Sequence, residues 1–415
     1  MKRLYVTLFF LFGLYVIAMS VYLLKGNLFQ IPSALSGTVA DPHTFMTLQE
    51  IAKSESLSRI HSLAFFVTSP LQMGLLLVLL GVAVKFRSAA EKWLQRPFFQ
   101  MMLFVLLFML LMDVLFLPID YALFRVDHAY GISNETMAMF WGDHAKDFLV
   151  NGFGTIILVW IFRWMMRRSP GRWWLWFWIA SIPLILFVTF IQPVVLDPIY
   201  NDFQPLQNQE LKKEILSLAA QSHIPTDQVY EVNMSERTNA INAYVNGIGG
   251  NARIVLWDTI LNKLQPQEIL TVMAHEMGHY VEKHIYWGIA YGIALSFIGF
   301  WLAFHAYRFF IRRWGSRLGI RGENDLAALP VLLLIATIIS FASAPAQNAF
   351  SRVIEHRADV YAMQLTGDGT SAIHAFQKIA KENLSPVTQP KLIQWFRGSH
   401  PTILERIQYF EGFSH

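Results

Sequence analysis

Residues 270–301 read LTVMAHEMGHYVEKHIYWGIAYGIALSFIGFW and join two kinds of sequence. The first half has two histidines four residues apart around a glutamate, at His275, Glu276 and His279. After His284 the charged residues stop, and an apolar run begins that is long enough to cross a bilayer as a helix. The stretch therefore predicts a polar helix that leads into a membrane span, with a metal site at the membrane surface.

The composition indicates a membrane protein. Of 415 residues, 54% are hydrophobic and 15% are charged, whereas ordinary globular chains carry about 25% charged residues. The formal net charge is +4, and the basic residues lie in short clusters between apolar runs, as in the loops of membrane proteins. We therefore expect no nucleic-acid partner. The chain has no cysteine, which excludes disulfides and thiolate metal ligands.

Seven apolar runs have close to the ~20 residues that a membrane-spanning helix needs. The first is flanked by basic residues and lacks a small-residue cleavage site, so we expect it to be retained as a span. The chain is thus expected to be a multi-pass integral membrane protein. The predicted spans are Leu4–Leu24, Ser62–Val84, Phe98–Leu117, Phe148–Met165, Trp173–Val195, Ile285–Tyr307 and Leu326–Ala346.

The polar stretches between these runs divide the chain into four predicted segments. In the first soluble stretch, VYEVNM, NAYVNG and RIVLWD predict strands, and the glycine-rich GIGGN predicts a hairpin turn between the last two. The second soluble stretch is predicted to be helical. The segments are five spans with their loops in 1–195, the first soluble stretch in 196–284, a helical hairpin in 285–346 and the C-terminal segment in 347–415.

The basic clusters predict the topology. With seven spans, the three most basic loops lie on one side of the membrane and both soluble stretches lie on the other. By the positive-inside rule, the soluble stretches are then expected outside the cytoplasm. The basic loops are residues 85–96, 167–172 and 308–321.

The HExxH motif predicts a catalytic zinc site. On a helix, His275 and His279 lie one turn apart on the same face, so both imidazoles can bind one zinc ion. The zinc lowers the pKa of a bound water, and Glu276 can accept the proton of that water. The alternative is a helix that carries two surface histidines by chance. His284 follows His279 by roughly 500° of helical rotation, so we expect it to point elsewhere, as an interfacial histidine.

A catalytic zinc needs a third protein ligand, and the stretch NAFSRVIEHRADVYAMQ offers Glu355. Asp359 follows one turn later, where it can orient a zinc-bound histidine. Taken alone, this stretch would be read as a helix with salt bridges to Arg352 and Arg357. The two predicted spans of 285–346 would form an antiparallel hairpin, however. The hairpin brings this stretch and the HExxH helix to the same side of the membrane.

These motifs resemble the type I CAAX prenyl proteases, seven-span zinc metalloproteases of a family that also includes bacterial HtpX-like heat-shock proteases. The resemblance rests on HEMGHYVEKH, NAFSRVIEHRADVYA, NAYVNGIGGNARIVLWDTIL, SHPTILERI and IQPVVLDPIYNDFQPL, and it extends from about residue 110 to the end. It implies a polytopic α-helical membrane protein whose seven helices enclose a chamber. A zincin-like α+β protease domain then lies at one membrane face.

The resemblance also implies residue roles. One zinc ion is held by His275, His279 and Glu355, and Glu276 is the general base. Asn242, Ala243 and Tyr244 lie on an edge strand that pairs with the substrate backbone. His400 donates a hydrogen bond to the oxyanion, and the alternative is a plain loop histidine. Arg406 is expected beside His400. Asp113 and Asn151 line the chamber or else form hydrogen bonds between helices.

The implied partners are membrane lipid and the C-terminus of a peptide or protein, with or without a prenyl group. For a prenylated protein, the implied reaction releases the last three residues. The membrane is either a bacterial inner membrane or the endoplasmic reticulum. One alternative is a bacterial quality-control protease for membrane proteins that does not require prenylation. Two others are a transporter with a metal in its cavity and a protease that cuts within the membrane.

Overall fold

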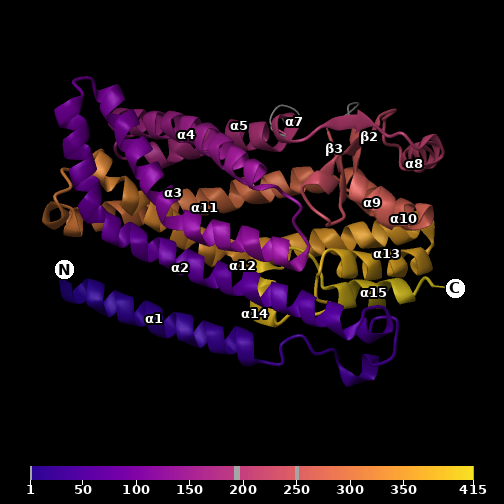
Figure 1. Cartoon of the computed structure of the whole chain (residues 1–415). Helices are drawn as coiled ribbons and strands as arrows, with labels where there is room; N and C mark the ends of the chain where they lie inside the picture. The colour runs from indigo at the N-terminus through magenta and orange to yellow at the C-terminus, as the bar shows by residue number, and fades with distance from the viewer. Residues whose placement is uncertain (1, 191–196, 248–251, 415) are drawn as a thin grey trace.

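Figure 1 shows the computed structural model of the chain, which describes residues 2–190, 197–247 and 252–414. Seven of its helices are long and apolar enough to cross a membrane, as the seven apolar runs predict. The predicted turn GIGGN lies mostly outside the described residues. The seven helices are α1 (Lys2–Lys25), α2 (Leu48–Trp93), α3 (Pro97–Tyr130), α4 (Met137–Arg168), α5 (Trp173–Phe190), α11 (His284–Trp314) and α12 (Leu329–Thr366).

Two of these helices extend well beyond a bilayer. At about 1.5 Å per residue, α2 and α12 are roughly 70 and 57 Å long, whereas the hydrocarbon core is about 30 Å thick. The apolar run that predicts the membrane span of α12 ends at Ala346, but the helix continues without a break to Thr366. Hydropathy therefore locates the part of a helix that lies in lipid and not the end of the helix. The boundary between segments 285–346 and 347–415 falls inside α12, and the fourfold division stays a prediction.

The soluble stretches build a small α+β unit at one end of the long helices, and this unit includes α13 (Gly369–Glu382) and α15 (Ile403–Glu411) (Figure 1). Its sheet has the strand order β1-β2-β4-β3, with β2 and β4 parallel and the other two pairs antiparallel. Strand β3 is therefore at an edge. The strands are β1 (Phe203–Pro205), β2 (Val229–Val232), β3 (Ala243–Asn246) and β4 (Arg253–Trp257).

Shorter helices cover this sheet and connect it to the spans. They are α7 (Asp197–Tyr200), α8 (Gln209–Gln221), α9 (Asp258–Lys263), α10 (Pro266–Val281), α13 (Gly369–Glu382), α14 (Lys391–Arg397) and α15 (Ile403–Glu411). Single 3₁₀ turns occur at Ser33–Leu35, Pro42–Thr44, Met234–Glu236, Ser316–Leu318 and Leu326–Ala328.

Helix α10 carries the HExxH motif through the core of the α+β unit. It starts at Pro266, whose missing N–H suits the first turn, and a capping box between Gln265 and Glu268 satisfies the helix start. Met273 and Met277 are fully buried between the sheet and the C-terminal helices. Apolar burial thus fixes the rotation of α10 about its axis, and with it the direction of the two motif histidines.

Contacts at the two ends of the spans show which loops lie together. At the sheet end, Ser133 of the α3–α4 loop forms a β-bridge with Thr238, and Glu50 at the start of α2 pairs with Lys381 of α13. At the opposite end, the buried side chain of Arg87 in α2 forms an ion pair with Asp325, just before α12. The soluble stretches therefore share one end of the molecule, as a chain with seven spans predicts.

Candidate active site

Three side chains that can bind a metal converge between α10 and α12. His275 and His279 come from α10, and Glu355 comes from α12. One ligand atom from each lies within 4.8 Å of the others. The two Nε2 atoms of the histidines are 3.2 Å apart, and the Glu355 carboxylate lies 3.3 Å from His275 and 3.5 Å from His279. The structure thus brings together the three residues that the sequence predicts as ligands.

The spacing of these atoms fits a tetrahedral metal. Ligands at the ~2.0–2.1 Å that zinc prefers would be about 3.3 Å from one another, close to the three separations observed here. In addition, the Oε2 atom of Glu355 is buried and forms no hydrogen bond with the described residues. A buried polar atom of this kind requires a partner, which a metal ion supplies. The residues present therefore fit the metal that the motif predicts.

Asp359 contacts His275 from the side opposite to the metal position. Its Oδ1 atom lies 2.9 Å from the Nδ1 atom of His275, the contact expected of a residue that orients a metal-binding histidine. Arg406 of α15 donates a hydrogen bond to the same carboxylate, and its guanidinium stacks on Phe376 at 3.9 Å. Arg406 is thus a partner of Asp359, whereas the sequence suggested only that it lies beside His400.

The surroundings of α10 shift the pKa values of the three motif residues, and the two histidines shift in opposite directions. Burial and the charge of Arg406 disfavour protonation of His275, but Asp359 and Glu355 outweigh both and raise its pKa to about 9. Burial and the neighbouring His275 lower the pKa of His279 to about 3. Burial raises the pKa of Glu276 to about 7. A carboxylate with a pKa near neutrality can both take up and release a proton, as general acid–base catalysis requires.

Among the described residues His284 is not one of the grouped metal ligands, as expected, but the prediction that it points away as an interfacial histidine is wrong. Its Nδ1 atom lies 3.0 Å from the Nδ1 atom of His279, and its side chain is buried. Helix α10 ends at Val281, and Lys283 adopts a left-handed conformation with φ of 57°, so the rotation of α10 does not continue to His284. A metal bound at Nε2 of His279 would leave the proton of that ring on Nδ1, which would then donate to Nδ1 of His284.

His400 reaches the metal centre from the loop before α15. Its Nε2 atom lies 3.3 Å from Glu355, and its side chain remains 57% exposed. The oxyanion role predicted for His400 stays a prediction, because the contact shows only that the ring borders the site. Asp113 of α3 contacts His144 of α4 at 3.2 Å, which is the predicted alternative of a hydrogen bond between helices. Asn151 is exposed on α4.

The predicted substrate strand lies beside the centre. Ala243 and Tyr244 belong to the edge strand β3, and Asn242 directly precedes it. Asn242 is exposed, and Ala243 is buried against α10 and the core. Tyr244 takes the alternate side of the strand and, among the described residues, is not part of the cavity walls next to the metal position.

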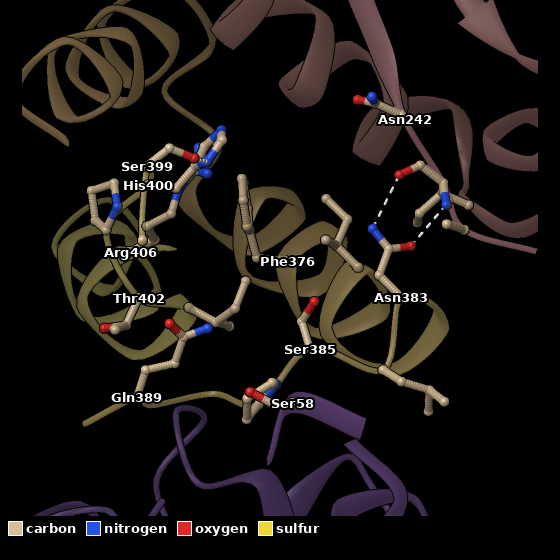
Figure 2. A pocket seen from close by; sticks show the side chains of 18 of the residues that line it. Ser58, Asn242, Phe376, Asn383, Ser385, Gln389, Ser399, His400, Thr402 and Arg406 are labelled. Atoms are coloured by element: carbon tan, nitrogen blue, oxygen red, sulfur yellow. Dashed lines mark hydrogen bonds between the residues drawn. The ribbon is translucent and has the colours of Figure 1, made fainter. Parts of the chain in front are cut away.

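Two cavities meet at these residues, and both are bordered by Asn242, Ala243, His275, Glu276 and His400. The first, here called the α14 cavity, has a volume of about 640 Å³ and extends past Asn383 and Ser385 towards Arg397 and towards Ser58 and His61 of α2. Figure 2 shows its interior, with His400 and Arg406 on one side and Asn242 and Asn383 on the other.

The second cavity, here called the α11 cavity, has a volume of about 600 Å³. It extends past Val245 to Ile285 and Tyr286 at the start of α11, and to Ile354 and Glu355 of α12. Glu276 borders both cavities and therefore lies where they meet. The sequence predicts the part of the α14 cavity wall next to the metal position but not the part formed by α2, α13 and α14, because no motif connects these three helices.

Two family models match the chain. One is described as peptidase family M48 and matches residues 205–413. The other is described as the CAAX prenyl protease N-terminal region with five membrane helices, and it matches residues 22–202. The chain belongs to peptidase family M48. It is a multi-pass membrane metalloprotease, and the predicted resemblance to type I CAAX prenyl proteases is confirmed.

Similar proteins occur in bacteria and in eukaryotes. The uncharacterized metalloprotease YhfN of Bacillus subtilis is 45% identical over 92% of this chain and 90% of its own length. CAAX prenyl protease 1 of Saccharomyces cerevisiae is 30% identical over 70% of this chain and 67% of its own length. The crystal structure of S. mikatae Ste24p superposes with a TM-score of 0.80 over 96% of this chain and 99% of that one, at 23% identity. That structure supports the fold.

Proposed function

We propose that this M48 metalloprotease is a zinc endopeptidase that releases the C-terminal tripeptide of prenylated CAAX proteins. The observation that carries the proposal is the convergence of His275, His279 and Glu355 beside Glu276, where two cavities meet. In this proposal the first three residues bind one zinc ion, and Asp359 orients His275. The name of the yeast relative, CAAX prenyl protease 1, supports the substrate class.

A zinc ion at this position would act as a Lewis acid on the scissile carbonyl and lower the pKa of the attacking water. The chain's own residues move the proton. Glu276, with a pKa near 7, takes the proton from the water and then delivers it to the leaving amine. His400, whose Nε2 atom faces Glu355, donates a hydrogen bond to the oxyanion that forms on the carbonyl oxygen.

The edge strand β3 holds the substrate backbone in this proposal. A peptide that adds to β3 in the antiparallel sense, the more stable pairing, has its C-terminal half towards Ala240 and the α14 cavity. Its N-terminal half then lies along Val245 and the α11 cavity. The apolar wall of the α11 cavity, with Ile285 and Tyr286 at the start of a membrane span, suits a prenylated cysteine next to lipid.

The test uses the purified full chain. We expect it to contain about one zinc per chain and to cleave a farnesylated CAAX peptide before its last three residues. Glu276→Gln should keep the zinc and lose about 10²–10⁴-fold in rate, because the proton acceptor is gone. Glu355→Ala should lose zinc. Tight stoichiometric zinc in Glu355→Ala would contradict the ligand set.

A second candidate is a quality-control protease for membrane proteins that does not need a prenyl group. It is favoured by the bacterial relative with 45% identity and by the basic loops, which lie at the end of the spans opposite to the metal centre. The same assay separates the candidates when it compares the farnesylated peptide with its unmodified form. A large preference for the farnesylated peptide supports CAAX processing, whereas equal cleavage supports quality control.

A further inference from the structure

Arg397 is a cation in the α14 cavity without an acidic partner. It lies at the end of α14, where one guanidinium N–H donates to the hydroxyl of Ser62 in α2 at 2.7 Å. The guanidinium also lies 5.9 Å from the ring centre of Phe65. The described residues offer it no carboxylate, and burial lowers its pKa without a compensating negative charge. Guanidinium has five donors in a planar fork, so most of its capacity remains for a ligand.

The two cavities differ in charge. In the described walls of the α14 cavity, Glu276 is the only carboxylate, while Arg397 and Arg406 are both cations. Arg406 is neutralised by Asp359, which leaves Arg397 as the uncompensated charge. The described walls of the α11 cavity contain Glu276, the metal-binding Glu355 and one lysine, Lys283, which is exposed to solvent, whereas Arg397 is partly buried. An anionic group of a substrate is therefore favoured in the α14 cavity.

The strand geometry limits what can enter this cavity. Asn383 bonds both backbone groups of Ile241, with the Ile241 N–H donating at 2.8 Å and the Asn383 amide donating back at 3.2 Å (Figure 2). Asn383 thus occupies the position that the next substrate residue would take along β3. A peptide in antiparallel pairing can follow the edge only as far as Asn242. Beyond that point its C-terminal residues must turn into the α14 cavity.

We infer that Arg397 binds the terminal carboxylate of the peptide that is cut, so that the α14 cavity measures the distance from the scissile bond to the chain end. This inference rests on the proposed function and deepens it, because it explains how an endopeptidase centre could select a C-terminus. The cavity volume of about 640 Å³ is of the size that holds a small peptide ligand. Arginine pairs with a carboxylate through two parallel hydrogen bonds, which an amide cannot reproduce.

The test measures binding rather than cleavage. Zinc-loaded full-length protein is titrated with valyl-isoleucyl-methionine and with the same tripeptide as a C-terminal amide. We expect the acid to bind about ten- to a hundredfold more tightly than the amide, as for a charge-assisted bidentate pair. Arg397→Gln should bring this ratio to within about twofold, and Arg397→Lys should retain part of it, since lysine keeps the charge but not the fork.

Matched variants separate recognition from structure. Ser62→Ala removes the hydrogen bond that tethers Arg397 but leaves the charge, and Lys381→Gln removes a cation outside the cavity that pairs with Glu50. Both should keep the ratio of the wild type. If Arg397→Gln fails to fold, the comparison of acid and amide on wild type and Arg397→Lys still decides.

Two results overturn the inference. One is equal binding of acid and amide to the wild-type protein. The other is an acid preference that survives in folded Arg397→Gln, since the carboxylate would then bind the metal or another group. Neither result depends on cleavage of a prenylated peptide. A failure of prenyl specificity in the cleavage assay is therefore distinct from a failure of carboxylate recognition.

Discussion

At the scale of single residues, His275 is the most constrained side chain of the metal centre. It is 6% exposed, with Asp359 at one ring nitrogen and Glu355 and His279 at the other. In the metal-free protein the two carboxylates hold a proton on this imidazole, and its pKa is about 9. A metal can bind only after that proton leaves. His279, with a pKa of about 3, is already a neutral imidazole at neutral pH, so its binding to a metal releases no proton.

Metal binding should therefore depend on pH through one group. Below pH 9 the His275 imidazole is protonated in the metal-free protein and neutral in the complex, so affinity rises as pH rises. Between about pH 7.5 and 8.5 we expect the apparent zinc affinity to increase about tenfold per unit, with one proton released per metal. Calorimetry in buffers of different ionisation enthalpy measures the protons. An affinity that is flat over this interval would contradict the prediction.

His284 should contribute to metal affinity as the acceptor for Nδ1–H of His279. We expect His284→Phe, which fills a similar space without an acceptor, to weaken zinc binding by about 10–100-fold. The matched control is His356→Phe, since His356 is exposed on α12 next to Glu355 and packs on Tyr409. Competition with a chelator gives the affinities. Equal zinc affinity in the two variants would show that His284 only fills space.

At the scale of elements, the metal centre depends on the close approach of α10 and α12. A Cβ atom at Gly278 would lie 3.1 Å from the Cβ of Tyr361 and 3.3 Å from the Cα of Ala358. The glycine between the two motif histidines therefore allows α12 to come near enough for Glu355 to complete the ligand set. Gly278 matters because it lacks a side chain, and not for its backbone freedom, since its backbone is ordinary α-helix.

Gly278→Val should separate the two helices. We expect a loss of about 1–3 kcal/mol in the free energy of unfolding from overpacking, together with weaker zinc binding as Glu355 moves away. The control is Gly288→Val on α11, where an added Cβ meets no heavy atom within 4 Å. It also corrects for the gain in helix propensity. Thermal unfolding and zinc titration should show both losses in Gly278→Val alone, and an unchanged affinity would sink the argument.

The elements also show why the sequence predicts some features and not others. Periodicity and spacing predict the seven spans, the HExxH helix and Glu355 because these are local patterns or pairings across one hairpin. The position of His284 depends on a single left-handed residue, Lys283, which no motif marks. The α14 cavity requires α2, α13 and α14 to meet, and contacts between residues more than 300 positions apart, such as Ser62 and Arg397, have no local signature.

At the scale of the whole molecule, the long helices connect the soluble unit at one side of the membrane with the basic loops at the other. Helix α2 runs from the wall of the α14 cavity, at Ser58, to the buried pair of Arg87 with Asp325 at the opposite end. Breaking that pair leaves an uncompensated buried charge, which typically costs about 3–5 kcal/mol. The packing of the long helices therefore determines which soluble segments meet. The direction in which the protein is inserted into the membrane follows from the charges of its loops.

The insertion can be tested directly because the chain has no cysteine. Lys213→Cys on α8 marks the metal-centre end, and Lys92→Cys at the end of α2 marks the basic end; both positions are exposed. By the positive-inside rule we expect a membrane-impermeant maleimide to label Lys213→Cys on intact cells and Lys92→Cys only after lysis. The opposite pattern would contradict this orientation. It would place Glu276 on the cytoplasmic side and remove the support that the basic loops give to the quality-control candidate.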